Sequence, residues 1–195
     1  MDSKVQKTHL RKTHLAARKA LLPEEKQRLD RAVFTRFTAL SQYKAAKTLL
    51  CYVSSATEVD TRAVLRHALQ AGKIVAVPRC IPGTNEMEFH KITSQSSLSP
   101  GAYGILEPPQ DTPLCTALSD ALCVVPALCF DKNGYRVGYG KGYYDRFLSR
   151  FSGETVGLIY EEDFVEAVPR DAFDRRVSLL VTPQRTLQTE PTPWF

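Results

Sequence analysis

The sequence predicts a single α/β domain over residues 1–195, with a mostly parallel central sheet flanked by helices. Short apolar runs that fit buried strands alternate along the chain with segments of helical periodicity. One such alternation, strand 48–53, helix 64–69 and strand 74–77, falls within about 30 residues, the length of a βαβ unit with parallel strands. At 43% hydrophobic composition, the 195 residues are enough for one substantial core.

The first expected element is a helix over residues 4–20. Its apolar stripe is narrow and comprises Leu10, Ala17 and Leu21. Four basic residues at spacings of four, three and four share an adjoining face: Lys7, Arg11, His14 and Arg18. Residues 1–50 hold 12 Lys and Arg against four Asp and Glu, so the N-terminal quarter is the cationic part of the chain. The basic face is therefore either a clamp for phosphates or a solvated surface, and the spacing leaves both open.

A second helix is expected to begin near Pro23, which suits a first turn, and to bury Leu29, Val33, Phe37 and Leu40. The helix over 64–69 is expected to end at Gly72 in the left-handed conformation.

The segment between the strand 48–53 and its helix contains Glu58. Ligands of parallel sheets bind beyond the carboxyl ends of the strands, which is where this segment lies. Glu58 is therefore a candidate contact to a ligand rich in N–H groups. The alternative is an acid in the first helical turn beside Asp60, where the helix dipole favours negative charge.

Residues 84–118 are expected to be irregular except for a short strand near 87–92. A loop of this length in a compact domain is usually a lid or a binding segment. Its segment Tyr103–Pro108 offers an aromatic ring and a carboxylate, on which a flat heterocycle could stack. Further strands are expected at 121–128, 155–160 and 177–182, with an acidic turn at 161–163 and a Pro-rich tail.

The most informative stretch is FDKNGYRVGYGKGYYDRFL, from Phe130 to Leu148. It places Lys141 among four glycines, with Arg136 before it and Asp145 after it. Glycines let backbone N–H groups approach a ligand, and a following helix adds its own N–H groups, so the stretch predicts a phosphate cradle. The alternative is a solvated glycine-rich turn. A P-loop is excluded because Gly142, and neither Ser nor Thr, follows the lysine. A dinucleotide fingerprint is excluded because Tyr143 replaces its third glycine.

Several other classes lack support in the sequence. The five cysteines form no CxxC pair, and the four histidines are scattered, so neither a disulfide framework nor a zinc cage is expected. No apolar run approaches the roughly 18 residues of a membrane helix, and the charged N-terminus does not fit a signal peptide. We therefore expect a cytoplasmic protein that does not bind membranes.

Together these residues describe a site for a nucleoside triphosphate with Mg²⁺. Phosphoryl transfer asks a protein for positioning and for neutralisation of phosphate charge, which Lys141, Arg136, Lys7 and Arg11 can supply. Magnesium prefers carboxylate and phosphate oxygens, so Asp145 and Asp174 are its candidate ligands.

The stretch from Phe130 resembles the FDxxGxRxGxGKGYYD segment of the 5-formyltetrahydrofolate cyclo-ligases, and every fixed position is matched. Weaker matches follow in the family's order. Lys7–Arg11 is similar to its KxxLR, Glu58–Thr61 to its ExxT, Tyr103–Pro108 to its aromatic-GI-x-EP segment, and Pro169–Pro183 to its closing acidic and TP elements. Phe173 stands where members commonly carry His or Trp, and the tail TEPTPWF matches no family element.

The resemblance implies a single domain of the NagB/RpiA/CoA-transferase-like fold. It also implies ATP- and Mg²⁺-dependent conversion of 5-formyltetrahydrofolate to 5,10-methenyltetrahydrofolate, with release of ADP and phosphate. In this reaction the formyl oxygen is phosphorylated and N10 of the folate then closes the ring. A monomer that acts on small molecules and binds no nucleic acid is expected.

The resemblance also implies site residues by position. ATP would contact Lys7, Arg11, Arg136, Gly138, Tyr139, Gly140, Lys141, Gly142, Tyr143 and Tyr144. The folate would contact Val53, Glu58, Tyr103 and the residues Tyr139, Gly140, Lys141, Gly142 and Tyr143. Magnesium would be held by Asp145 and Asp174, and catalysis would fall to Lys141, Arg136 and Tyr143.

Two rival functions remain open at this stage. One is a nucleotide-dependent ligase or kinase of the same fold that acts on another metabolite. The other is a nucleic-acid-binding module that uses the basic helix, whose affinity would fall steeply with salt.

Overall fold

The computed structural model describes residues 2–189, and of Tyr103 only the backbone. Its largest sheet has seven strands in the order β12-β11-β9-β6-β1-β2-β3. These are β1 (Thr48–Cys51), β2 (Ile74–Cys80), β3 (Met87–Ile92), β6 (Ala121–Val125), β9 (Glu154–Leu158), β11 (Leu179–Val181) and β12 (Thr186–Gln188). The five inner strands pair in parallel, while β3 and β12 pair antiparallel at the two edges. The predicted α/β class with a mostly parallel sheet is confirmed.

Both faces of this sheet are buried, because successive side chains of a strand point to opposite faces. In β1, Leu49 and Cys51 belong to one core cluster and Leu50 to the other. The same alternation holds in β6, where Leu122 and Cys123 belong to different clusters. Burial on both faces explains why these strands read as continuous apolar runs.

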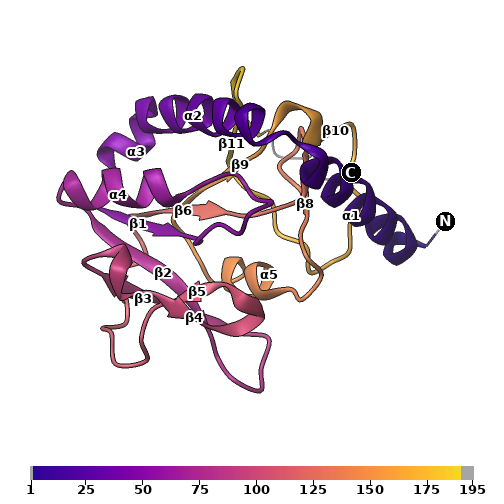
Figure 1. Cartoon of the computed structure of the whole chain (residues 1–195). Coiled ribbons are helices and arrows are strands. Elements are labelled where there is room, and N and C mark those ends of the chain that lie inside the picture. The colour runs from indigo at the N-terminus through magenta and orange to yellow at the C-terminus, as the bar shows by residue number, and fades with distance from the viewer. Residues whose placement is uncertain (1, 190–195) are drawn as a thin grey trace.

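Three helices cover one face of the sheet: α2 (Pro23–Ala39), α3 (Ser41–Ala45) and α4 (Arg62–Gln70) (Figure 1). Helix α2 begins at Pro23 and buries Leu29, Val33 and Phe37, as predicted. Gly72 follows α4 with φ +72°, also as predicted. Helix α3 was not predicted, since five residues are too few to show a helical period.

The opposite face carries helix α5 (Tyr143–Leu148) and a second, three-stranded sheet. That sheet comprises β7 (Cys129–Asp131), β8 (Arg136–Val137) and β10 (Phe164–Val165). The turn between β7 and β8 is held by Asp131, whose carboxylate accepts the N–H groups of Asn133 and Tyr135. The predicted strand 121–128 is shorter than expected: it ends at Val125, and Pro126 separates it from β7. The glycine stretch begins in this small sheet and ends in α5.

Helix α1 (Ser3–Ala20) lies at one end of the molecule beside β8 (Figure 1). Its buried residues are Lys7, His14 and Arg18, all of them cationic or polar. The predicted apolar stripe is wrong at Ala17, which is exposed. Polar contacts, with partly buried Leu10 as an apolar addition, dock this helix.

Residues 84–118 hold more structure than the sequence predicts. Beyond β3, they form η1 (Gln95–Ser97), β4 (Ser99–Pro100), η2 (Ala102–Gly104) and β5 (Leu106–Glu107), and β4 pairs with β5. The acidic turn forms η3 (Glu161–Asp163), and β12 lies in a segment expected to be a Pro-rich tail. The last part of that tail, residues 190–195, lies outside the described residues. Within residues 2–189, no helix is long and apolar enough to cross a membrane.

Candidate active site

A cavity of about 480 Å³ opens at the carboxyl ends of the parallel strands. Tyr52 and Val53 follow β1, Cys80 ends β2, and Pro126 follows β6, and all four residues line it. This is where open α/β sheets bind their ligands, because the loops diverge beyond the strand ends.

Nearly all of the predicted site residues meet in this one cavity. Its lining includes Lys7, Arg11, Val53, Glu58, Arg136, Gly138, Tyr139, Gly140, Lys141, Gly142, Tyr143, Tyr144, Asp145 and Asp174. Helix α1, the β1–α4 loop, the glycine stretch and the segment before β11 are thus brought together. Tyr103 has its backbone in η2, and its side chain lies outside the described part of the structure.

The cavity lining contains a group of cations, of which Lys7 and Arg136 form ion pairs with carboxylates. The Lys7 ammonium lies 2.7 Å from Asp171 Oδ2 and 2.5 Å from Asp174 Oδ2. Burial lowers the pKa of Lys7, but these two carboxylates outweigh it, so the pKa is raised overall. Arg11 Nε donates to the carbonyl of Gly138 at 2.8 Å, which ties α1 to the glycine stretch.

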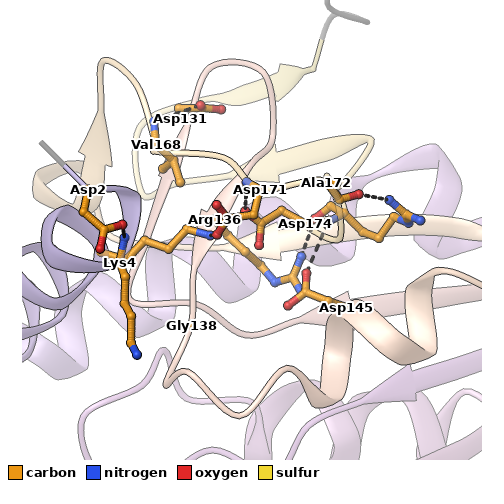
Figure 2. Close-up of polar contacts among 12 residues, drawn as sticks. Asp2, Lys4, Asp131, Arg136, Gly138, Asp145, Val168, Asp171, Ala172 and Asp174 are labelled. Atoms are coloured by element: carbon orange, nitrogen blue, oxygen red, sulfur yellow. Dashed lines mark hydrogen bonds and ion pairs between the residues drawn. The ribbon is translucent and has the colours of Figure 1, made fainter.

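Arg136 and Asp145 form the second ion pair of this group. Arg136 Nη2 lies 2.9 Å from Asp145 Oδ1, and its other terminal nitrogen donates to the carbonyl of Arg175. The Arg175 N–H also donates to Asp145 Oδ1, at 3.2 Å. Figure 2 shows Arg136, Asp145 and Asp174 gathered at this point. Arg136 therefore holds Asp145 against the segment that carries Asp174.

The two predicted magnesium ligands line the cavity but do not form a complete metal site by themselves. Asp145 and Asp174 are 28% and 19% exposed, and each faces a cation of the protein. Among residues 2–189, no group of three or more His, Cys, Asp or Glu side chains is arranged to hold a metal ion.

The glycine loop requires glycine where its backbone adopts positive φ. Gly140 and Gly142 have φ +93° and +73°, in the region that residues with a Cβ rarely adopt. A Cβ at Gly140 would also lie 3.2 Å from the Arg11 guanidinium. The predicted helix after the loop forms, but α5 has only six residues, so the cradle rests chiefly on the loop and the surrounding cations.

Tyr139 joins the glycine loop to the loop that carries Glu58. Partial burial raises the pKa of the half-exposed Tyr139 hydroxyl, and the neighbouring Glu58 carboxylate raises it further. The Glu58 carboxylate is buried and accepts the Ser55 N–H at 2.8 Å. Because α4 is capped at Thr61, Glu58 lies outside its first turn, and the alternative as a helix-start acid is wrong.

Several cavity residues were not predicted: Tyr52, Ser55, Pro78, Cys80, Met87, Ile105, Glu107 and Pro126. Those at the ends of β1, β2 and β6 could have been found from the strand-end rule. Glu107 was noted only as the carboxylate of its segment; it is buried and accepts the Cys80 N–H at 3.2 Å. Met87 comes from an antiparallel edge strand, for which the sequence carries no positional signal.

The interpretation of the basic face of α1 as one phosphate clamp is half wrong. Lys7 and Arg11 line the cavity, whereas His14 and Arg18 contact a buried Asp163 outside it. The solvated-surface alternative is also wrong, because Lys7, His14 and Arg18 are all buried. A buried, paired face offers little to a nucleic acid backbone, which removes the main support for that rival.

Comparisons with known proteins agree with this geometry. The sequence model of the 5-formyltetrahydrofolate cyclo-ligase family matches residues 3–183. The chain is 30% identical to 5-formyltetrahydrofolate cyclo-ligase of Mus musculus, over 82% of this chain and 84% of that protein. It is also 30% identical to the Escherichia coli K12 enzyme of the same name, over 86% and 95%.

Solved structures give the same result for the fold. The 5,10-methenyltetrahydrofolate synthetase of Aquifex aeolicus superposes with a TM-score of 0.84 at 33% identity, covering 97% of this chain and 95% of that one. A synthetase from Mycoplasma pneumoniae superposes with a TM-score of 0.73 at 25% identity, covering 91% and 98%.

Proposed function

The chain belongs to the 5-formyltetrahydrofolate cyclo-ligase family, and we propose that the cavity at its strand ends is where 5-formyltetrahydrofolate and ATP react. The enzyme catalyses the ATP-dependent cyclisation of 5-formyltetrahydrofolate to 5,10-methenyltetrahydrofolate. The observation that carries the site assignment is that the family's glycine stretch lines a cavity whose lining combines cationic side chains with apolar side chains and buried carboxylates.

The cationic part of the lining is assigned to the phosphates of ATP. Lys7 and Arg11 reach it from α1, Arg136 from β8 and Lys141 from the glycine loop. These residues carry four positive charges, enough to balance most of the charge on a triphosphate. Lys7 and Arg136 are paired with carboxylates in the structure, so ATP must compete for them.

The rest of the cavity is assigned to the folate. It is lined by apolar groups such as Val53, Pro78 and Ile105, and it contains the buried carboxylates of Glu58 and Glu107. A pterin is a flat heterocycle whose edge carries N–H groups. Carboxylates are strong acceptors of hydrogen bonds from such groups. Glu58 is the contact assigned from the sequence.

The proposed chemistry places the reacting atoms where these two parts of the cavity meet. The formyl oxygen attacks the γ-phosphorus of ATP, ADP departs, and the lone pair of N5 stabilises the resulting iminium phosphate. N10 then attacks the formyl carbon and loses its proton, after which the carbon–oxygen bond breaks and phosphate leaves. We assign to Lys141 the neutralisation of charge on the transferred phosphoryl group, and Tyr143 follows it at the start of α5.

Asp145 and Asp174 fit Mg²⁺ as partial ligands, because that ion usually takes one or two carboxylates and completes its shell with phosphate and water. When bound, the ion would neutralise phosphate charge. Each carboxylate now faces a cation that we assign to the phosphates. With the ion bound, Asp145 and Asp174 would hold it, and Lys7 and Arg136 would be available to the phosphates.

The test mixes the purified protein with 5-formyltetrahydrofolate, ATP and Mg²⁺ and follows the long-wavelength absorbance of the methenyl product. We expect Lys141→Ala to lose at least about 100-fold in kcat/KM, the effect typical of removing one charge-stabilising group. Because Lys141 is exposed, the variant should fold normally, which circular dichroism checks.

The matched control is Lys132→Ala, an exposed lysine of the same stretch that lies in the β7–β8 turn. It should keep wild-type kinetics. Full activity of Lys141→Ala would contradict the cradle assignment. No absorbance from a wild-type protein that binds ATP would instead favour another metabolite as substrate.

A further inference from the structure

A single buried carboxylate fixes helix α1 to the body of the protein. Asp163 lies at the end of η3 and is 2% exposed. His14 Nδ1 lies 2.8 Å from its Oδ1, and Arg18 Nε donates to its Oδ2 at 2.7 Å. Both carboxylate oxygens therefore contact the same helix, one turn apart.

The neighbouring acids of η3 behave differently. Glu162 is exposed, and Glu161 pairs with Arg185, 2.5 Å away, near β12. Arg18 is held further by the carbonyl of Leu128, to which Nη2 donates at 3.0 Å. The sequence shows three equivalent acids in this turn, but only Asp163 is turned inward toward α1.

This anchor shares a helical face with the two cavity cations. Lys7, Arg11, His14 and Arg18 follow one another at spacings of four, three and four. At 1.5 Å rise per residue, Arg11 lies roughly 5 Å and Lys7 roughly 10 Å along the helix from His14. A small swing of α1 about its anchored half would therefore move Lys7 most.

The contacts of α1 also differ in whether the partner residue lines the cavity. Lys7 and Arg11 contact Asp174 and Gly138, which line the cavity, and Lys7 also pairs with Asp171, which does not. His14 and Arg18 contact Asp163 away from the cavity. Of the ion pairs that dock α1, those of Lys7 with Asp171 and Asp174 use a cation that we assign to ATP, whereas those with Asp163 involve no residue of the cavity lining.

We propose that Asp163 is a positioning residue for the nucleotide: it anchors α1 through His14 and Arg18 and thereby places Lys7 and Arg11 against the phosphates of ATP. The inference rests on the proposed function, because it takes Lys7 and Arg11 to be ATP contacts. A purely structural role for Asp163 predicts lost stability but no change in substrate recognition.

The Michaelis constants separate these two roles. Partial unfolding lowers the concentration of active enzyme and hence the apparent kcat, but leaves the KM of the folded molecules unchanged. Misplacement of α1 acts on the folded molecules and raises the KM for ATP. We expect about a tenfold rise in the KM for ATP in Asp163→Asn, with a smaller rise in the KM for 5-formyltetrahydrofolate.

The matched control is Glu161→Gln, which removes a carboxylate–arginine pair from the same η3 without touching α1. It should leave both KM values unchanged. Equal KM values for Asp163→Asn and wild type, or equal rises for both substrates, would overturn the proposal.

Asp163→Asn leaves the buried Arg18 guanidinium without its charge partner, a change that is often strongly destabilising. Arg18→Met combined with Asp163→Asn removes the charge together with its arginine partner and serves as the variant that keeps the fold. It should show the same selective rise in the KM for ATP, and a wild-type KM would overturn the proposal.

Lys7→Ala distinguishes failure of the inference from failure of the proposed site. If it leaves the KM for ATP unchanged, Lys7 is not an ATP contact and the site assignment fails. If Lys7→Ala raises that KM and the Asp163 variants do not, only the anchor is wrong.

Discussion

At the residue scale, several buried charges in this protein face opposite charges, and the sequence does not show which pairs form. Arg18 pairs with Asp163, which is distant in the chain, and Arg136 pairs with Asp145 on the other side of the glycine loop. Breaking such a pair leaves an uncompensated charge in a poorly solvated place. The basic pattern of α1 was visible in the sequence, but its division into cavity and anchor residues depended on where Asp163 lies in space.

Glu58 gives a prediction at this scale. Glu58→Gln keeps the shape of the side chain and an acceptor for the Ser55 N–H but removes the negative charge. If the carboxylate accepts N–H groups of the pterin, the loss of charge-assisted hydrogen bonds costs about 1.5–3 kcal/mol. We expect the KM for the folate to rise at least about tenfold, with little change in the KM for ATP, in steady-state kinetics.

The control for Glu58 is Asp60→Asn in the same loop. The Asp60 carboxylate accepts from Ser54 Oγ and from the Arg62 N–H, and the residue is not part of the cavity lining. This variant should affect stability through the start of α4 and leave both KM values near wild type. A similar rise in the folate KM in both variants would assign Glu58 a loop-shaping role.

At the scale of elements, the glycine loop can form because its glycines adopt positive-φ backbone conformations that other residues rarely adopt. Its sequence signal was strong, since the glycines, Lys141 and the flanking charges stand together. The contacts of the loop were not visible: Arg11 approaches Gly140 from α1, and Tyr139 reaches the loop of Glu58. The loop is therefore the element that lies between α1 and the loop of Glu58.

Gly140→Ala tests the loop against a matched glycine. Both Gly140 and Gly83, in the β2–β3 turn, have positive φ, so alanine at either position should cost about 1–2 kcal/mol of unfolding free energy. A Cβ at Gly140 would meet the Arg11 guanidinium, whereas a Cβ at Gly83 meets nothing within 4 Å.

We expect similar losses of stability in urea unfolding for Gly140→Ala and Gly83→Ala, but a raised KM for ATP only in Gly140→Ala. An unchanged KM in Gly140→Ala would show that Arg11 tolerates displacement. A raised KM in Gly83→Ala would show that backbone strain alone, without the Arg11 contact, disturbs the site.

At the scale of the whole molecule, the sequence predicted what depends on local order along the chain. The βαβ unit, the buried strands and α2 follow from periodicity, and the strand-end rule then places the site. Edge strand β12 and the β4–β5 pair were missed because each is too short to show alternation. The polar docking of α1 was missed because the partners of its cations lie in loops near residues 163 and 171–174.

The packing of the two sheets gives the last prediction. Phe130, the first residue of the glycine stretch, is fully buried in β7 and packs on Gly157 in the centre of β9. A Cβ at Gly157 would lie 2.5 Å from Phe130 Cζ and 2.8 Å from Leu180 Cδ2. Position 157 therefore requires glycine, because the ring of Phe130, at the start of the glycine stretch, occupies the space that a side chain would need.

Gly157→Ala should lower the unfolding free energy by about 1–3 kcal/mol through overpacking. Phe130→Leu removes the ring atom that the new methyl group meets and leaves a gap that costs about 1–3 kcal/mol alone. In the double variant the methyl group fills part of that gap, so the loss should be smaller than the sum of the single losses by at least about 0.5 kcal/mol. Phe37→Leu, on the opposite face of the sheet, should instead add independently to Gly157→Ala. Urea unfolding of the five variants measures both couplings. If the losses of Gly157→Ala and Phe130→Leu are additive, the small sheet moves away from β9 as a unit. The contact between Phe130 and Gly157 would then not hold the glycine stretch in place.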